Sequence, residues 1–199
     1  AILLVVIMIP KMKSFYEKSL EKRLDTDGIA TPGTLTRVIN GELQIFSPEQ
    51  MMKGYWSGDP DNRLSEDGWY KTGDACEQAE DGYIKMVGRA KDIILRGGEN
   101  ISPLEIENAL LSHPNVEDIA VVGYPDDRLG SRIAAVVVGQ NEISLEDLRH
   151  HCETCGLAKA KWPEFFTIID KIPLSAIGKV QRGILEDHVA EVIKKGVKV

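Results

Sequence analysis

Three charged side chains stand in settings where they could act on a nucleotide. Asp74 closes a Thr-Gly-Asp segment, and a carboxylate at the end of a tight glycine turn can accept hydrogen bonds from both hydroxyls of a ribose. Arg89 carries a planar fork of donors that suits ribose and phosphate oxygens. Lys179 follows Gly178, which leaves room for its loop to enter a closed site. Each also has an ordinary interpretation: a turn aspartate, a surface arginine that pairs with Asp92, and a solvated lysine before the last helix.

Two further motifs could carry chemistry, and each has a plainer explanation. Gly97 and Gly98 let a ligand or another chain segment approach the backbone closely, but paired glycines also form ordinary hairpin turns. Cys152 and Cys155 follow two histidines at a helical spacing that could bind zinc. A lone CxxC is a weak signal, and the segment has the pattern of an amphipathic helix, so we predict no metal. A zinc or redox domain stays an alternative.

The elements that would position these residues follow from turn signals and apolar spacing. In the first half, Asn40-Gly41 predicts a hairpin, and residues 54–73 are rich in turn formers and aromatics, which predicts a loop. Residues 11–23 predict a solvated helix. The strands expected in this half are residues 2–9, 33–39, 41–46 and 83–87.

The second half alternates between strand and helix patterns. Ser102 is an N-cap with Pro103 at the first helical position, Ser144 begins a second helix by the same logic, and residues 182–195 form a closing helix. These helices should pack on a short sheet, which makes this half a small α+β domain that begins near Lys91. The expected strands are residues 93–95, 116–124, 132–139 and 165–170.

Composition excludes several classes of protein. The 199 residues are 43% hydrophobic and 28% charged, which is typical of a globular protein. The net charge is −7, with Lys and Arg dispersed among acids, so no nucleic-acid partner is expected. No apolar run approaches the roughly 20 residues that span a bilayer, so no transmembrane segment is expected. Three cysteines without disulfide spacing favour a cytoplasmic location.

The order of the motifs resembles the C-terminal part of the adenylate-forming (AMP-binding) enzymes, of the acyl-CoA synthetase type. This superfamily also contains firefly luciferase and the adenylation domains of peptide synthetases. The resemblance extends from about residue 28 to the C-terminus, and it departs from the family at Leu174, where a basic residue is usual. The segments that carry it are residues 70–74, 88–92, 96–100 and 173–182.

The resemblance implies an α+β fold in two parts. Residues 1–90 would be the β-rich C-terminal part of a large AMP-binding domain, which is incomplete here. Residues 91–199 would be the small, mobile C-terminal lid domain. Lys91 would be the hinge about which this domain rotates between the pose for adenylation and the pose for thioester formation.

The resemblance also assigns roles to single residues. Asp74 and Arg89 would bind the nucleotide, and Gly97 and Gly98 would line the pantetheine tunnel for CoA. Lys179 would be catalytic, because its ammonium can stabilise the charge that develops on the carboxylate oxygens and the α-phosphate. Lys179 is the residue on which the expected chemistry depends most.

These roles describe an ATP-dependent acid–thiol ligase of fatty acid metabolism. Its substrates would be a carboxylic acid and CoA, with ATP and Mg²⁺ required and AMP and pyrophosphate released. The Ser/Thr/Gly-rich phosphate loop and the aromatic-Gly-x-Thr-Glu segment of the family do not occur in the sequence. We therefore expect the chain to be a portion of the enzyme, inactive in adenylation by itself, with Mg²⁺ bound mainly by a missing N-terminal domain.

Two other functions stay open at this point. A peptide-synthetase-like adenylation domain would deliver its acyl group to a carrier protein, but no carrier domain follows the last helix, which favours a CoA ligase. A non-catalytic docking module could use the same small domain, and it would be indifferent to the loss of Lys179.

Overall fold

The computed structural model describes residues 26–49, 51, 63–139 and 143–196. It divides into two compact units, residues 1–91 and 92–199, so the division falls one residue after the predicted boundary. The strand expected at residues 2–9 and the helix expected at residues 11–23 lie outside the described residues.

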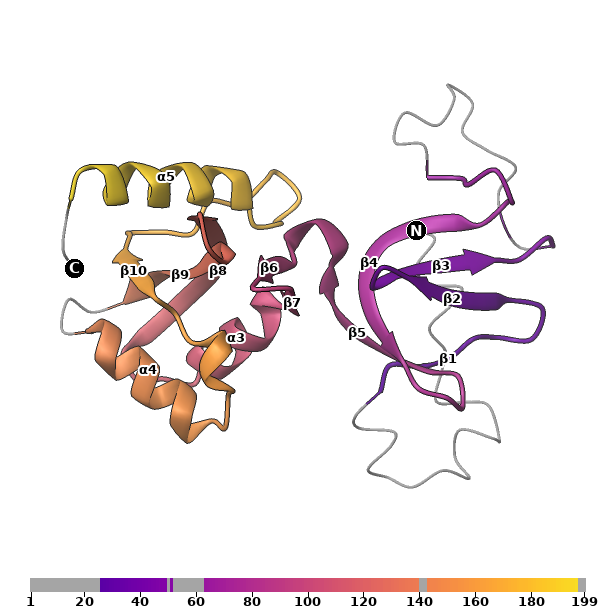
Figure 1. The fold of residues 1–199 in the computed structure, drawn as a ribbon, viewed down its shortest axis with the longest axis horizontal. Helices are drawn as coiled ribbons and strands as arrows, with labels where there is room; N and C mark the ends of the chain where they lie inside the picture. The colour runs from indigo at the N-terminus through magenta and orange to yellow at the C-terminus, as the bar shows by residue number, and fades with distance from the viewer. Residues whose placement is uncertain (1–25, 50, 52–62, 140–142, 197–199) are drawn as a thin grey trace. The chain divides into compact units, whose positions relative to one another are not determined.

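The first unit contains an antiparallel sheet of five strands in the order β1-β5-β4-β3-β2 (Figure 1). Asn40 and Gly41 have φ angles of 52° and 81°, which is the left-handed pair that a two-residue hairpin needs, so the predicted turn is confirmed. Leu43, Ile45 and Ile84 are buried at the centre of this unit. The strands are β1 (Gly28–Ile29), β2 (Leu35–Ile39), β3 (Glu42–Phe46), β4 (Tyr70–Gln78) and β5 (Tyr83–Arg89).

Strand β4 corrects the loop predicted for residues 54–73, because the strand already begins at Tyr70. Gln44 of β3 lies opposite Lys71, whereas Glu42 lies opposite Ala75, so β4 bulges between these two pairs. Gly73 lies in the bulge with φ +74°, a conformation that glycine adopts without strain. The glycine that suggested a turn therefore marks a bulge within a strand.

The second unit is built around β9, which pairs antiparallel with β8 along its length and parallel with β10. Its β6–β7 hairpin joins the same sheet where Arg96 pairs with Gly130. A short 3₁₀ turn, η2 (Ala90–Asp92), spans the division between the two units. The strands are β6 (Ile94–Arg96), β7 (Glu99–Ile101), β8 (Val116–Asp126), β9 (Gly130–Gly139) and β10 (Phe165–Ile168). The helices are α3 (Pro103–Leu110), α4 (Leu145–Thr154) and α5 (Arg182–Lys194), with a 3₁₀ turn η3 (Lys159–Lys161).

Side-chain caps fix where the first two helices begin. Ser102 Oγ accepts a hydrogen bond from the Glu105 amide at 3.4 Å, and Pro103 is the first residue of α3. Ser144 Oγ accepts from the Asp147 amide at 3.1 Å, while the Ser144 amide donates to Asp147 Oδ2 at 2.9 Å. This reciprocal pair is a capping box, and both predicted helix starts are confirmed.

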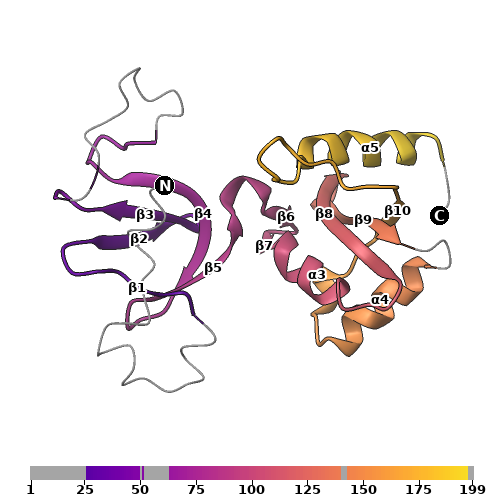
Figure 2. The same ribbon diagram turned by 180° about the vertical axis from the view of Figure 1, so that it is seen from behind.

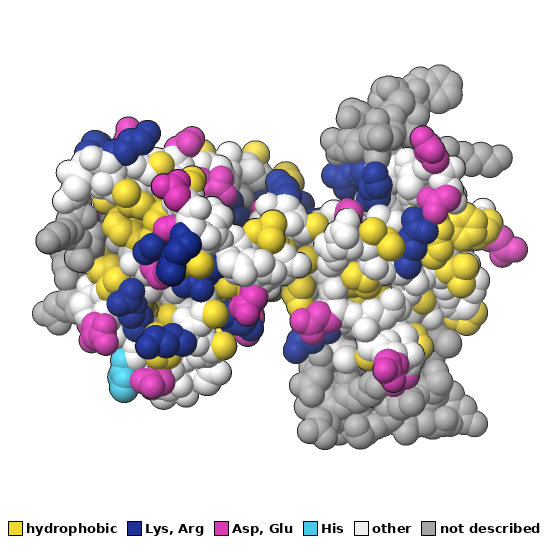
Figure 3. Space-filling view, in the orientation of Figure 1, with side chains coloured by type: hydrophobic (Ala, Val, Ile, Leu, Met, Phe, Trp, Pro, Cys, Tyr) yellow, Lys and Arg dark blue, Asp and Glu magenta, His cyan; other side chains and the backbone are white. Residues whose placement is uncertain are grey.

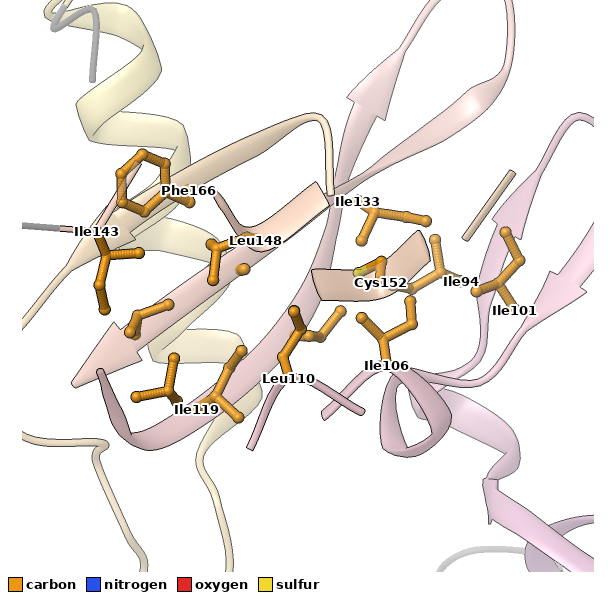
Figure 4. Packing of buried hydrophobic residues seen from close by; sticks show 14 residues of the cluster. Ile94, Ile101, Ile106, Leu110, Ile119, Ile133, Ile143, Leu148, Cys152 and Phe166 are labelled. Atoms are coloured by element: carbon orange, nitrogen blue, oxygen red, sulfur yellow. The ribbon is translucent and has the colours of Figure 1, made fainter. Parts of the chain in front are cut away.

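Alternating residues of β9 build two cores on opposite faces of the sheet. Ile133, Ala135 and Val137 pack in the cluster that contains residues of α3 and α4, which Figure 4 shows from close by. Ala134 and Val136 pack with residues of α5 in the other cluster. The helices α3 and α4 thus cover one face and α5 the other (Figure 1 and Figure 2). The predicted α+β fold is confirmed, and the structure adds that its helices lie on both faces of the sheet.

Candidate functional site

Asp74 is held inside strand β4 rather than at the end of a turn. Its residue is 4% exposed, and its amide donates to Thr72 Oγ1 at 3.1 Å. Thr72 Oγ1 in turn donates to the Leu43 carbonyl at 2.8 Å, and the Gly73 amide donates to Glu42 Oε1 at 2.9 Å. Backbone and side-chain bonds therefore fix the bulge that carries the Asp74 carboxylate.

The structure brings Asp74 and Arg89 together, although they are far apart in the sequence. The two residues are register partners on β4 and β5, and Arg89 Nη1 lies 2.5 Å from Asp74 Oδ1. The Arg89 side chain is 44% exposed and that of Asp74 only 6%, so the guanidinium covers the carboxylate and reaches solvent itself. The alternative pairing of Arg89 with Asp92 does not occur, because Asp92 pairs with Arg182 instead.

Cys76 lies two residues beyond Asp74 on the same strand and is buried. Burial, followed by the negative charges of Asp74 and Glu77, raises the pKa of the Cys76 thiol to about 11. This thiol stays neutral at physiological pH, so the charged groups of this region are Asp74 and Arg89 rather than a thiolate.

Lys91 is the last residue of the first unit, and Gly97 and Gly98 follow it near the start of the second unit. Lys91 is exposed in the 3₁₀ turn η2. Gly97 and Gly98 have φ angles of +59° and +88° and connect β6 to β7 as a two-residue hairpin. The Gly97 amide donates to the Leu129 carbonyl at 2.8 Å, which fastens the turn to the sheet. The local geometry is that of a hairpin turn, and a contact with a thiol substrate stays a prediction.

Lys179 lies in a tight turn directly before α5. The Ser175 amide donates to the Lys179 carbonyl at 2.8 Å, and the Lys179 amide donates to Ser175 Oγ at 3.1 Å. Gly178 has φ +75°, and neighbouring Ile177 is 77% exposed. The Lys179 side chain is exposed, and no described residue holds its ammonium in an ion pair. The turn therefore presents Lys179 at the surface of its unit with its charge available to a ligand.

The second unit matches a known family at the residues that carry this turn. Residues 105–179 match the family described as the AMP-binding enzyme C-terminal domain, so Lys179 is the last residue matched. The chain is also 37% identical over 186 residues to the medium-chain fatty-acid–CoA ligase of Escherichia coli, covering 85% of this chain and 33% of that protein. The chain belongs to the adenylate-forming, AMP-binding superfamily.

Solved structures of this superfamily have the same fold. The chain superposes on the ATP-bound MatB from Rhodopseudomonas palustris with a TM-score of 0.69 and 30% identity, covering 84% of this chain and 36% of MatB. For the o-succinylbenzoate CoA synthetase MenE from Bacillus subtilis in complex with the acyl-adenylate intermediate, the TM-score is 0.77 and the identity 29%, covering 92% of this chain and 38% of MenE. The chain thus spans about a third of the length of the relatives it matches.

The second unit contains a charged network that sequence reasoning missed. Arg182, the first residue of α5, donates from Nη1 and Nη2 to the two oxygens of Glu107 at 2.7 Å and 3.2 Å. It also donates from Nε to Asp92 Oδ2 at 3.3 Å and from Nη1 to the Val121 carbonyl at 2.5 Å. Burial lowers the pKa of Arg182, but the bonds and charges of Glu107 and Asp92 outweigh it and raise the pKa. Only the wide separation of these residues in sequence hid the network.

Basic side chains also gather around β10 on the face of the second unit drawn in Figure 3, with acidic side chains among them. Glu164, which directly precedes β10, accepts from Arg96 Nη2 at 3.1 Å and lies 3.9 Å from Arg132 Nη1. Because Arg96 is the last residue of β6, its ion pair with Glu164 anchors the base of the turn at Gly97 and Gly98.

None of the described helices combines the length and apolar character needed to cross a bilayer.

The two cysteines that raised the zinc alternative have opposite environments, with Cys152 in the last turn of α4 and Cys155 directly after the helix. Cys152 is fully buried in the core, whereas Cys155 is exposed beside Ser112, with the Sγ and Oγ atoms 3.9 Å apart. Among the residues that the structure describes, no group of three His, Cys, Asp or Glu side chains could hold a metal ion. Leu148 and Cys152 pack α4 into the core of the second unit.

We expect Cys155 to react with iodoacetamide at pH 8 well before Cys152. Burial, with a smaller effect of Cys155, raises the pKa of the Cys152 thiol to about 11, so little reactive thiolate is present at that pH. Mass spectrometry of the alkylated peptides measures both rates, and unfolding in denaturant should make them equal. Equal rates in the folded protein would contradict this core packing.

Proposed function

We propose that this chain works within an ATP-dependent acid–thiol ligase of the acyl-CoA synthetase type. The observation that carries the proposal is the Asp74–Arg89 pair, which holds a carboxylate acceptor and a guanidinium fork 2.5 Å apart on neighbouring strands. Asp74 stands in the motif whose aspartate, by the family resemblance, binds the ribose hydroxyls of ATP and AMP, and Arg89 stands in the motif whose arginine touches the nucleotide. The names of the relatives, which include a medium-chain fatty-acid–CoA ligase, support a carboxylic acid as substrate.

In the proposed first half-reaction, a carboxylate oxygen of the acid attacks the α-phosphorus of ATP. The bond to the β-phosphate oxygen breaks, pyrophosphate leaves, and an acyl-adenylate forms. Asp74 accepts hydrogen bonds from the ribose hydroxyls, and Arg89 donates to nearby nucleotide oxygens. The Lys179 ammonium stabilises the negative charge that develops on the reacting oxygens, which is most effective in a site that excludes water.

In the proposed second half-reaction, the CoA thiol releases its proton to water as its sulfur attacks the acyl carbon, the bond from that carbon to the oxygen bound to phosphorus breaks, and AMP leaves with this former carboxylate oxygen. Gly97 and Gly98 line the path of the pantetheine arm, because a turn without side chains lets a narrow ligand pass close to the backbone. Lys91 is the proposed hinge between the two half-reactions, and residues 1–90 and 91–199 are the proposed partial AMP-binding domain and lid domain. A cytoplasmic location stays part of the proposal.

Mg²⁺ would screen the triphosphate charge in such a reaction. The described residues offer no group of three His, Cys, Asp or Glu side chains for it, so no step proposed here runs through the metal. The contribution assigned to this chain is limited to binding the nucleotide, stabilising charge and admitting the thiol.

ATP- and CoA-dependent thioester formation over a panel of carboxylic acids tests the proposal. The panel should contain straight-chain acids of increasing length together with aromatic and dicarboxylic acids. The samples are the full-length enzyme that carries this sequence, its Lys179→Ala variant, and the chain by itself. We expect activity in the first, a large loss in the second and none in the third. If no acid is converted by the full-length enzyme, the ligase function is wrong and a docking module becomes the better hypothesis.

A further inference from the structure

Arg182 joins four segments of the second unit through one guanidinium group. Its partners are Asp92 at the end of η2, Glu107 on α3, and the backbone carbonyl of Val121 on β8, while Arg182 itself begins α5. Glu107 Oε1 also accepts from the Val121 amide at 2.8 Å. Both carboxylates and the strand backbone are therefore held by the same side chain.

This network is largely shielded from water. The side chains of Arg182, Glu107 and Asp92 are only 18%, 13% and 22% exposed. A mostly buried ion pair needs good geometry to offset the loss of hydration, and the two-pronged contact of Arg182 with Glu107 provides it. Such a pair has one well-defined arrangement, which makes it suited to fixing the position of what is attached to it.

Arg182 is connected to two segments with a proposed role in the reaction: the turn that carries Lys179 and the segment that follows Lys91. Lys179 lies three residues before it, and the loop between them closes through the Gln181 amide, which donates to the Pro173 carbonyl at 2.9 Å. On the other side, Asp92 directly follows Lys91. A displacement of the Arg182 side chain would therefore shift the base of the Lys179 turn and the segment that begins at Asp92, directly after Lys91.

We propose that Arg182 is a positioning residue for Lys179, and that it also fixes the segment after Lys91 to the body of the second unit. This inference rests on the proposed function, because it assumes that Lys179 acts in acyl-adenylate formation. Arg182 itself need not touch substrate: its bonds point into the unit, to α3 and β8. Its effect on the reaction should then depend on Lys179 being present.

The test replaces Arg182 with methionine and with lysine in the full-length enzyme. Arg149→Met is a matched control, because Arg149 is also partly buried and donates to a backbone carbonyl, that of Pro163, at 2.9 Å. We expect Arg182→Met to slow acyl-adenylate formation by roughly tenfold to a hundredfold, with little change in the KM for ATP. Arg182→Lys should recover part of this loss, since it keeps the charge but not the fork, and Arg149→Met should have little effect.

A double variant separates positioning from general destabilisation. If Arg182 acts through Lys179, Lys179→Ala combined with Arg182→Met should be no slower than Lys179→Ala alone. Multiplied losses would overturn the inference while leaving the proposed function intact. If Lys179→Ala itself has no effect, the proposed role of Lys179 is wrong.

Hydrogen exchange on the chain itself gives an answer that does not depend on activity. In the Arg182→Met variant, the amides of Lys179 and Gln181 should exchange several-fold faster, whereas those of α4 should keep their wild-type rates. Unchanged exchange in the turn would show that Arg182 does not hold it, and faster exchange throughout the unit would show a loss of overall stability instead.

Discussion

Replacing Lys179 with alanine is expected to slow acyl-adenylate formation by about 10²–10³-fold, the usual cost of removing one group that stabilises developing charge. The expectation follows from the turn geometry, which exposes the ammonium without a described ion-pair partner. The loss should fall on the rate of adenylation rather than on ATP binding, because the charge develops only in the transition state. ATP–pyrophosphate exchange in the full-length enzyme measures this step.

Transfer from a synthetic acyl-adenylate to CoA isolates the second half-reaction, and the Lys179→Ala variant should perform it at close to the wild-type rate. Lys171→Ala is the matched control, because Lys171 is another exposed lysine of the same unit and stands just before the loop that carries Lys179. Equal losses in both variants would mean that general positive charge matters rather than the placement of Lys179. A loss confined to thioester transfer would show that Lys179 acts in the second half-reaction, and the proposed role in adenylation would be wrong.

Much of the second unit could be predicted because its signals are local. The N-cap serines at 102 and 144 and the proline after the first of them lie within one helical turn of the backbone groups they satisfy. The hairpin at Asn40-Gly41 is equally local, since the turn itself requires two left-handed residues. The nucleotide-site residues came from the order of motifs, a resemblance that local physics alone would not supply.

The features that could not be predicted depend on contacts between distant residues. The sequence around Gly73 predicts a turn, and only the pairing of β4 with β3 shows that Gly73 lies in a bulge of β4. The parallel pairing of β10 with β9 likewise has no local signal. Arg182 and Glu107 are far apart in the sequence, and each reads as an ordinary charged residue on a helix until the fold buries them together.

Replacing Asp74 with alanine should lower kcat/KM for ATP by roughly a hundredfold, since hydrogen bonds to a charged group contribute about 1.5–3 kcal/mol each. The carboxylate is nearly buried, and the backbone bonds of the bulge hold it in place, so the ribose hydroxyls would meet a fixed acceptor. Arg89 is 44% exposed and can be solvated when its partner is removed, so the fold should tolerate the change. Steady-state kinetics with ATP, together with a thermal unfolding curve, measures both effects.

The ribose contact itself is tested by comparing ATP with its 2′-deoxy and 3′-deoxy analogues. The wild-type enzyme should discriminate against at least one analogue, because a missing hydroxyl leaves the Asp74 carboxylate without that hydrogen bond. In the Asp74→Ala variant this discrimination should disappear, since the acceptor is gone. Glu77→Ala, which removes an exposed carboxylate from the same strand, should discriminate as the wild type does. If Asp74→Ala still discriminates fully, then the ribose hydroxyls are bound by other residues, and the ion pair of Asp74 with Arg89 stabilises the pairing of β4 with β5 instead.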